Sequence, residues 1–397
     1  MKQQEKLLIQ FGAGNIGRSF VGQIFARNGW EVVFVDVDAE LLKRLNSDRS
    51  YDVVVKDPDG SEERITVAGV RGVDATDSKA VARELERTAY VGSAVGSSAI
   101  SHVIPLLAAE CARRHREEPG RLPFDVILAE NIHDGASLVQ GLIRSALPQD
   151  LPPSALPGVV ECSVGKMVPL LTEEAKQKEP TTVFAERYNT LILDSRAWKN
   201  PIPPIPELAP VDNIAAYVDR KLFIHNLGHA AVAYLGHPRH PEATYLYELL
   251  EDEEVSQGAR RAMECSAEAL VKAYPESFTR EQLRDHIDNL LYRFRNRALG
   301  DTVHRVGRDL QRKLSGEDRV VGAIRLAHRH GVDPEPIVEV YRKALRFRAP
   351  DEKGALFPGD EEFHETLLRE GPGYLLKEIS GLREGEALFD YLNRRVG

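Results

Sequence analysis

The sequence predicts an α/β protein with an N-terminal doubly wound parallel sheet, followed by a mostly α-helical C-terminal domain. In the first half of the chain, short β-branched runs alternate with stretches of helical spacing, as in parallel strands covered on both faces. Residues 201–210 then hold five prolines, which can neither continue a helix nor occupy a central strand. Helical periodicity dominates after them, so we expect two domains, over residues 1–200 and 201–397.

The first elements form a strand–helix–strand unit. Residues 7–11 read LLIQF and residues 31–36 read EVVFVD, two runs with the composition of buried strands. Between them, the apolar residues of 18–27 recur at helical spacing, and Asn28-Gly29 is a helix stop signal. This unit predicts two adjacent parallel strands.

The later elements continue this alternation with one exception. Strand-like runs follow at residues 90–95 and 124–129, separated by helical stretches. Residues 52–67 instead predict an inserted β-hairpin, because Asp57-Pro58-Asp59-Gly60 is a strong turn sequence between two strands. In the second half, the longest helical patterns run over residues 211–235, 257–273 and 280–299.

The composition restricts the possible partners. The 397 residues include 52 Lys and Arg against 61 Asp and Glu, a net charge of −9, which argues against a nucleic-acid or anionic membrane surface. Cys111, Cys162 and Cys265 are odd in number and widely spaced, so neither a disulfide framework nor a cysteine-rich zinc site is expected. The first strand leaves no room for a signal peptide, and no apolar stretch reaches the ~18 residues of a membrane span. We therefore expect a cytoplasmic protein, which can still bind a small anion.

A glycine-rich loop, Gly12-Ala13-Gly14-Asn15-Ile16-Gly17, connects the first strand to the first helix. In a Rossmann-like fold the first glycine permits the tight turn, the second lets the backbone approach a pyrophosphate, and the third lets the helix pack closely on the strand. The free N–H groups at the start of the helix would face the anion. We therefore expect this loop, including Asn15 and Ile16, to bind a dinucleotide.

An acidic residue at the end of the second strand indicates which dinucleotide. Asp36 lies 24 residues after Gly12, where a carboxylate can accept hydrogen bonds from both hydroxyls of the adenosine ribose. The same carboxylate would repel a 2′-phosphate, so NAD is favoured over NADP. Asp38 remains an alternative, since strand ends are uncertain by a residue or two. Small residues at the end of a later strand, including Val95 and Gly96, would leave space for the cofactor, although tight strand–helix packing explains them about as well.

A predicted helix in the second half places four polar side chains on one face. At about 100° per residue, His225, His229 and Asn226 lie about 40°, 80° and 140° from Lys221. The neighbouring residues are apolar, so the pKa of Lys221 is expected to fall from about 10.4 towards neutrality, which suits it to remove a hydroxyl proton. A lysine that only extends its ammonium group to solvent from a buried helix explains the pattern equally well.

The spacing of His225 and His229 also occurs in zinc sites. No glutamate stands between the two histidines in the position that metalloproteases require, and two prolines place the later His237 and His240 in a loop. We therefore predict no metal site.

Together, these motifs resemble the polyol-specific long-chain dehydrogenases, and in particular their bacterial mannitol-1-phosphate 5-dehydrogenase branch. KLFIHNLGHA at residues 221–230 is similar to the family signature K-x4-N-x2-H, and FGAGNIGR at residues 11–18 is similar to the opening of that branch. The resemblance covers nearly the whole chain and includes RFRN at residues 293–296 and HRVGRDLQRKLSGEDR at residues 304–319.

This resemblance implies metal-independent hydride transfer between NAD and a polyol or its phosphate. It assigns the general base to Lys221, and it assigns Asn226 and Asn131 as the two amides that hold the reacting oxygen. His229 matches the family residue that positions the substrate beside the lysine.

Basic residues near position 310 are the predicted contacts to the substrate. The resemblance assigns this role to Arg305 and Lys313. Arg305, Arg308 and Arg312 fall at i, i+3 and i+7, which predicts a basic stripe on one helix face that could hold a phosphate by forked hydrogen bonds. The alternative is a solvated face whose arginines pair with nearby acids such as Asp309.

One departure from the family pattern bears on the substrate. Where the family has Val-Asp-Arg-Ile-Val-Pro, residues 164–169 read VGKMVP, so Gly165 replaces an aspartate that helps to bind substrate hydroxyls. We expect the pair to be a sugar-alcohol phosphate and a ketose phosphate, mannitol 1-phosphate and fructose 6-phosphate above all. One alternative is a dehydrogenase of an unphosphorylated polyol or hexuronate, similar to mannitol 2-dehydrogenases or to tagaturonate and fructuronate reductases, and another is a non-catalytic NAD(H)-binding protein. The sequence leaves open whether the protein is a monomer or a dimer.

Overall fold

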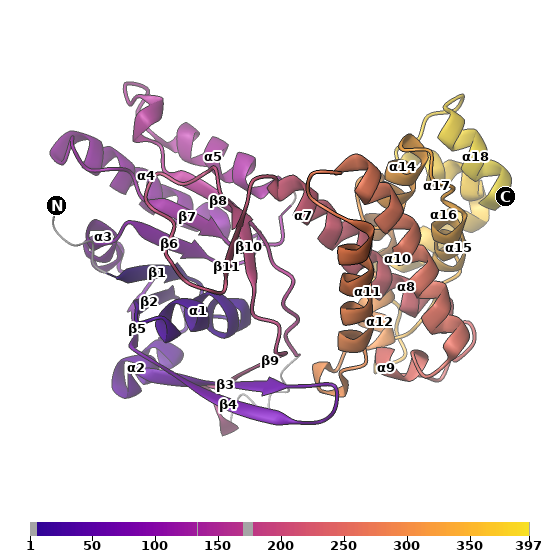
Figure 1. The fold of residues 1–397 in the computed structure, drawn as a ribbon, viewed down its shortest axis with the longest axis horizontal. Helices are drawn as coiled ribbons and strands as arrows, with labels where there is room; N and C mark the ends of the chain where they lie inside the picture. Colours follow the sequence, from indigo (N-terminus) through magenta and orange to yellow (C-terminus); the bar gives the residue numbers. More distant parts are fainter. Residues whose placement is uncertain (1–5, 133, 170–177, 397) are drawn as a thin grey trace. The chain divides into compact units, whose positions relative to one another are not determined.

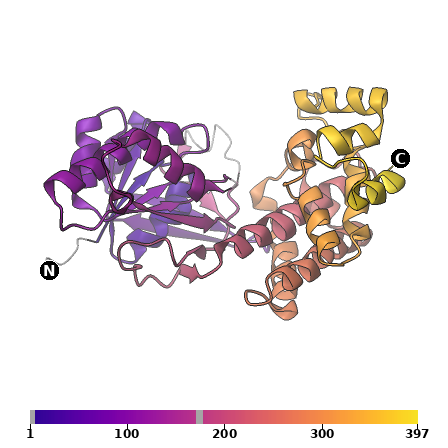
Figure 2. The same ribbon diagram turned by 90° about the horizontal axis from the view of Figure 1, so that it is seen from above.

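The structure is a computed structural model that describes residues 6–132, 134–169 and 178–396. The chain divides into two compact units, and the division falls between Ile214 and Ala215. Figures 1 and 2 show that the first unit is built around a β-sheet and that the second unit consists of helices.

An eight-stranded sheet in the order β11-β10-β8-β7-β6-β1-β2-β5 forms the first unit. Its parallel strands are β1 (Leu7–Phe11), β2 (Glu31–Asp36), β5 (Val70–Asp74), β6 (Tyr90–Ser93), β7 (Asp125–Leu128) and β8 (Gly158–Ser163). Beyond β8, β10 (Leu191–Asp194) runs antiparallel and pairs with β11 (Leu208–Val211) at the edge. The parallel strands have the order of a dinucleotide-binding sheet, which confirms the predicted fold class.

Helices cover both faces of this sheet. On one face lie η1 (Gly17–Gly22) and α1 (Gln23–Arg27), and on the other lie α3 (Ser78–Arg87), α4 (Ile100–Glu117) and α5 (Gly135–Ala146). The alternation of β1 explains the two layers, because Leu8 joins the apolar cluster under η1 and α1 whereas Leu7 and Ile9 join the cluster under the other helices. A short 3-10 turn, η2 (Pro153–Ala155), precedes β8.

The predicted hairpin is present and belongs to the core. After α2 (Ala39–Asp48), β3 (Ser50–Lys56) pairs antiparallel with β4 (Glu62–Ala68), and β9 (Val183–Ala185) extends them to a three-stranded sheet. Tyr51 and Val53 of β3 lie in the same apolar cluster as Phe20 of η1. The second sheet therefore helps to cover the helix that follows the glycine-rich loop.

The proline-rich stretch ends in a strand that the sequence did not predict. We expected a helix from residue 211, but β11 occupies Leu208–Val211 and the helix begins at Ile214. Pro210 is tolerated within β11 because this strand lies at the edge of the sheet, where a missing backbone N–H need not break a ladder on both sides.

The second unit is helical, as predicted. α7 (Ile214–Arg220), η3 (Lys221–Asn226) and α8 (Leu227–Gly236) follow one another without a break, and they lead into the helices that surround α10 (Glu253–Ala273). α8, α11 (Arg280–Phe294), α14 (Val321–Arg329) and α15 (Glu335–Ala344) pack directly against α10. The shorter elements are α9 (Leu246–Leu249), η4 (Arg297–Leu299), α12 (Val303–Gly307), α13 (Leu310–Lys313), α16 (Pro358–Glu370), α17 (Pro372–Glu378) and α18 (Ala387–Val396). Among the residues that the structure describes, no helix combines the length and the apolar character needed to cross a membrane.

Candidate functional site

The glycine-rich loop lies at the carboxyl end of β1, beside the point where the strand order reverses between β1 and β6. Gly12 has a φ of 87°, and a Cβ atom there would collide with the carbonyl oxygen of Ala94. A Cβ atom at Gly17 would collide with the carbonyl oxygen of Gly12. Around Gly14, in contrast, no described atom other than those of its neighbours along the chain lies within 4 Å of the Cβ position. The loop thus has the tight turn and the close helix packing that the sequence predicts, and its backbone is open to a ligand at Gly14.

Asp36 stabilises this loop from the end of β2. Its Oδ2 accepts a hydrogen bond from the N–H of Ala13 at 2.6 Å, and its Oδ1 accepts from the N–H groups of Val37 and Asp38 at 2.7 and 3.1 Å. The carboxylate of Asp38 instead caps α2, where it accepts from the N–H of Leu41 at 3.0 Å. Of the two aspartates considered, Asp36 is the one that contacts the glycine-rich loop.

Arg18 is a buried charge beside the loop to which the sequence analysis gave no role. It donates from Nε to the carbonyl oxygen of Ala13 at 2.6 Å and from Nη1 to that of Thr181 at 2.6 Å. Burial lowers the pKa of its guanidinium, opposed by attraction to Tyr51, Asp36 and Asp38. The final arginine of FGAGNIGR therefore holds the loop from within, and its position among apolar helix residues was the only signal in the sequence.

Glu130 is a second residue that the sequence analysis missed. From the end of β7, its Oε1 accepts hydrogen bonds from the Ser93 hydroxyl at 2.8 Å and the Val95 N–H at 2.7 Å, and its Oε2 accepts from the Gly96 N–H at 2.9 Å. The side chain is buried. Because β1, β2, β6 and β7 are parallel, their carboxyl ends lie at one edge of the sheet. Glu130 thus fixes the loop after β6 beside the glycine-rich loop.

Two further predicted positions also belong to the first unit. Asn131 follows Glu130 directly and is exposed. In the segment that departs from the family pattern, Lys166 is buried and donates from Nζ to Oδ1 of Asn189 at 3.0 Å, and the ring of Tyr188 lies beside Gly165. The changed segment is therefore tied to the 188–189 loop of its own unit.

In the second unit, the segment that carries Lys221 contains a π-helical turn. The N–H of Leu227 donates to the carbonyl oxygen of Leu222, five residues earlier. Residues five apart lie on the same face of such a turn, whereas an α-helix would separate them by about 140°. The π turn therefore brings Asn226 over Lys221 more closely than the helical spacing of the sequence implies. Turns of this kind are frequent at functional sites.

The burial pattern separates His225 from its neighbours. Between residues 223 and 236, only Asn226 and His229 are less than fully buried, and Lys221 is also partly accessible. The ring of His225 packs 5.5 Å from that of Phe294, and burial lowers the pKa of His225 well below its usual value. We conclude that His225 is a neutral core residue, whereas the other three predicted residues retain access.

Lys221 has the lowered pKa that the sequence predicts. Burial of the ammonium group, together with repulsion from Arg319, lowers the pKa of Lys221 to about 8. Arg319 is itself held by Asp318, with 2.7 Å between Nε and Oδ1. A lysine with this pKa exchanges its proton near neutral pH, as a general base must. Arg319, the last residue of HRVGRDLQRKLSGEDR, had no role in the sequence analysis.

His229 is held between a carboxylate and an aromatic ring. Its Nε2 lies 3.0 Å from Oδ2 of Asp301, and its ring stacks on Phe294 with the centroids 4.8 Å apart and the planes at 22°. Oδ1 of Asp301 forms an ion pair with Arg305. One buried carboxylate thus connects two of the predicted site residues, on α8 and α12.

The predicted basic stripe along a single helix is wrong. α12 ends at Gly307 and α13 begins only at Leu310, and between them Asp309 has a φ of 69°. Asp360 stabilises this break, since it accepts hydrogen bonds from the N–H groups of Asp309 at 3.0 Å and Leu310 at 2.7 Å. Helical spacing could not reveal the break, because Asp360 lies 51 residues beyond Asp309.

Lys313 is a buried contact within this unit. Its Nζ donates to the carbonyl oxygens of Val306 and Arg308, both at 2.5 Å. Burial lowers the pKa of Lys313 to about 7, and Arg319 and Arg312 contribute. The ammonium group therefore donates to carbonyl groups at the end of α12 that would otherwise lack a partner within that helix. Its role as a substrate contact stays a prediction.

The other two arginines of this region differ in their partners. Arg312 pairs with Asp309 at 2.5 Å and with Asp318 at 3.2 Å, as in the alternative interpretation of a basic face balanced by acids. Arg308 is exposed, with its guanidinium 5.5 Å from the ring centre of Phe357, and within the described ranges no carboxylate forms an ion pair with it. Arg308 is therefore the most available of the predicted phosphate contacts.

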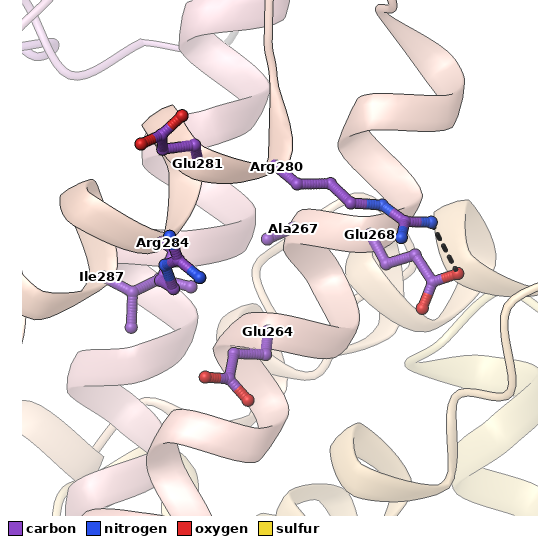
Figure 3. A pocket seen from close by; sticks show the side chains of 7 residues that line it. All are labelled: Glu264, Ala267, Glu268, Arg280, Glu281, Arg284 and Ile287. Atoms are coloured by element: carbon purple, nitrogen blue, oxygen red, sulfur yellow. Dashed lines mark ion pairs between the residues drawn. The ribbon is translucent and has the colours of Figure 1, made fainter.

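A cavity of about 480 Å³ lies elsewhere on the second unit, along α10 and α11 (Figure 3). Charged side chains dominate its walls, and Glu268 and Arg280 face each other across it at 3.9 Å. It includes none of the predicted site residues.

Over the described part of the chain, no group of three or more His, Cys, Asp and Glu side chains could hold a metal ion.

Comparison with known proteins identifies the family. Residues 6–207 match the family described as Mannitol dehydrogenase Rossmann domain, and residues 213–390 match the Mannitol dehydrogenase C-terminal domain. The chain belongs to the mannitol dehydrogenase family. This places the protein among polyol dehydrogenases, as the resemblance of its motifs implies.

Two solved structures share the fold of this mannitol dehydrogenase family member. D-sorbitol dehydrogenase in a substrate-free form is 17% identical with a TM-score of 0.76, and the alignment covers 98% of this chain and 91% of that chain. Mannitol 2-dehydrogenase of Pseudomonas fluorescens, in a ternary complex with NAD and D-mannitol, is 16% identical with a TM-score of 0.73, covering 99% and 92%. The fold is thus shared over nearly the full length.

Proposed function

We propose that this protein is an NAD-dependent dehydrogenase that interconverts a sugar-alcohol phosphate and a ketose phosphate, with mannitol 1-phosphate and fructose 6-phosphate as the pair. The observation that carries the reaction type is the π turn that brings Asn226 over Lys221, whose pKa is about 8. A proton acceptor and an amide donor on one turn suit the oxidation of an alcohol.

The carboxyl edge of the first sheet fits NAD. Gly14 leaves the backbone open for a pyrophosphate, and Asp36 ends β2 as a carboxylate that would repel a 2′-phosphate. Three backbone N–H groups already donate to Asp36, and a carboxylate has about four acceptor sites, so acceptor capacity remains for a ribose hydroxyl. The loop of Val95 and Gly96, fixed by Glu130, would border the same ligand. When bound, NAD supplies the carbon that accepts or donates the hydride.

The remaining chemistry belongs to side chains of this chain. In the oxidative direction, the neutral amine of Lys221 takes the proton of the carbinol hydroxyl, while the hydride leaves the carbon that carries this hydroxyl. The amide of Asn226 donates a hydrogen bond to the carbinol oxygen, and the family resemblance adds Asn131 as a second amide donor. In the reductive direction, the ammonium group of Lys221 returns the proton to the new alkoxide. His229 positions the substrate next to the lysine.

The choice of a phosphorylated substrate rests mainly on Arg308. Its guanidinium is exposed and has no carboxylate partner among the described residues, so it can bind a phosphate by forked hydrogen bonds. A second candidate is a dehydrogenase of an unphosphorylated polyol or hexuronate. It is favoured by the pairing of Arg305 with Asp301 and of Arg312 with Asp309, which leaves fewer positive charges for a phosphate.

The oxidation of NADH, measured side by side with fructose 6-phosphate, free fructose and a ketohexuronate, distinguishes these functions. We expect kcat/KM for fructose 6-phosphate to exceed that for fructose by at least about tenfold, the contribution of a charged hydrogen bond to a phosphate. A preference for fructose or the hexuronate would establish the second candidate. Binding of NADH without turnover of any of the three would contradict both.

A further inference from the structure

We propose that Asp301 is a positioning residue, whose single carboxylate fixes His229 and Arg305 relative to each other. This inference rests on the proposed function, in which His229 positions the substrate, and on the family resemblance, which assigns Arg305 as a substrate contact. Asp301 is 8% exposed, so its charge is almost wholly removed from water. An isolated carboxylate at such a depth is costly unless it is paired on both oxygens. Asp301 meets this condition with Nε2 of His229 and the guanidinium of Arg305.

The carboxylate of Asp301 favours one of the two ring nitrogens of His229 as the carrier of the proton. Oδ2 of Asp301 lies 3.0 Å from Nε2 outside hydrogen-bond geometry, and its negative charge favours a proton on Nε2, so Nδ1 of the neutral ring is left as the acceptor. Phe294 stacks on the same ring and restricts its plane. The ring of His225, 6.4 Å from that of His229, stays neutral and does not compete for the carboxylate. Phe294 therefore restricts the orientation of the His229 ring, and the charge of Asp301 favours its Nε2–H tautomer.

The backbone around Asp301 is fixed as well. Its carbonyl oxygen accepts a hydrogen bond from the N–H of Leu246 at 2.8 Å, and the next residue, Thr302, forms an isolated β-bridge with Tyr245. The hydroxyl of Thr302 caps α12 by accepting from the N–H of Arg305 at 3.1 Å. The carboxylate thus stands on the same short segment that starts the helix of Arg305. A change at Asp301 should therefore affect both partners and leave the first unit untouched.

The chain contains a matched control for this arrangement. Elsewhere in the second unit, the partly buried Asp252 pairs with Nε2 of His240 at 2.8 Å and with Nε of Arg239 at 2.7 Å. This is the same combination of aspartate, histidine and arginine, but it lies outside the predicted site. Asp252 also caps α10, and asparagine is an equally good cap, so Asp252→Asn changes the charge without removing the cap.

The experiment compares Asp301→Asn with Asp252→Asn in steady-state reduction of the better ketose substrate by NADH. We expect Asp301→Asn to lower kcat/KM for the ketose by about 10- to 100-fold, the range seen when a carboxylate that orients a metal-bound histidine is lost. The KM for NADH should stay within about twofold, and Asp252→Asn should change neither quantity. In a double-mutant cycle, the variant with both Asp301→Asn and His229→Gln should lose less transition-state stabilisation than the sum of the losses in the two single variants. The reason is that both changes disrupt the same contact. Unchanged ketose kinetics, an equal rise in the KM for NADH, or additive losses would overturn the proposal.

A second readout does not depend on turnover or on the variant folding. Long-range ¹H–¹⁵N NMR of the wild-type protein with labelled histidine, assigned by His229→Gln, reports which ring nitrogen is protonated. We expect the Nε2–H form for His229. The Nδ1–H form would overturn the inference even if the enzyme is active. Conversely, absence of turnover in the wild type together with the Nε2–H form would contradict the proposed function and leave the contact between Asp301 and His229 established.

Discussion

The carboxylate of Asp36 accepts a hydrogen bond from the backbone N–H of Ala13 at 2.6 Å. This contact joins the carboxyl end of β2 to the glycine-rich loop after β1. The side chain that is predicted to select the cofactor therefore also holds the loop that is predicted to bind it. Loss of its charge should weaken both functions at once.

Substitution Asp36→Asn should raise the KM for NAD by about tenfold, because charged hydrogen bonds to the ribose and to Ala13 become neutral ones. The discrimination against NADP should shrink, since the repulsion of a 2′-phosphate is lost. Initial rates with NAD and NADP at saturating polyol measure both effects. Asp38→Asn is the control, because asparagine still caps α2 and the cofactor preference should persist. Equal effects of the two substitutions would argue against Asp36 as the ribose contact.

Substitution Lys221→Ala should lower kcat by ~10² to 10⁴, the range for loss of a general base. The Kd for NADH, measured by fluorescence titration, should change little, because Lys221 lies outside the predicted cofactor loop. Lys272→Ala, at an exposed lysine on α10, should be without effect. Normal turnover in Lys221→Ala would refute the base assignment.

The pH dependence should follow the pKa of Lys221, which is about 8. Oxidation of the polyol needs the neutral amine, so its kcat/KM should rise with pH and level off above about 8. Reduction of the ketose needs the ammonium form and should decline over the same range. In Arg319→Gln the repulsion that favours the neutral amine is lost, so both profiles should move to higher pH. If the pH profiles do not move, Arg319 does not influence the pKa of Lys221.

Substitution Arg308→Ala should raise the KM for fructose 6-phosphate by about 10- to 100-fold and leave the KM for free fructose unchanged. Arg312→Ala should have a smaller effect, because Asp309 and Asp318 already balance the charge of Arg312. Steady-state kinetics of both variants with both sugars provides the comparison. A loss shared equally by the two sugars would remove Arg308 as a phosphate contact.

Substitution Lys313→Met should change how stability depends on pH. Burial lowers the pKa of Lys313 from 10.5 to about 7, so between these values the unfolded chain binds more protons at this residue than the folded protein. The wild-type free energy of unfolding should therefore rise with pH relative to that of the variant, by at least about 1 kcal/mol between pH 7 and 9.5. Urea unfolding of both proteins at these two pH values gives the difference. A constant difference would mean that Lys313 titrates normally in the fold.

The sequence predicts local geometry well where only a few residue types fit the backbone conformation or the available space. Gly12 and Gly17 could be placed because few other residues allow a positive φ or so close a helix, and the hairpin could be placed from its Asp-Pro-Asp-Gly turn. The lowered pKa of Lys221 followed from apolar neighbours within the same helix. These features depend on contacts close along the chain.

Features that depend on distant parts of the chain escaped prediction. Arg308 and Arg312 seemed to share a helix face by spacing, but Asp360 breaks that helix from a later segment. Glu130 and Asp301 are ordinary acids in the sequence, and their roles arise only when the fold brings amides or a histidine to them. The π turn could not be predicted either, because over six residues the spacing of apolar residues fits an α-helix and a π turn about equally.

That π turn has a consequence for how the helix tolerates changes in length. A π turn contains roughly one residue more than an α turn, so it amounts to a one-residue insertion absorbed within Lys221–Asn226. Deleting one residue there would restore a regular α-helix and would leave the parts before and after it in nearly the same relative rotation. Lys221 and Asn226 would then be four residues apart, about 40° around the helix, so they would still share one face. The π turn should therefore tolerate the loss of one residue, whereas a deletion in the regular helix α8 would rotate the residues on its two sides by about 100° relative to each other.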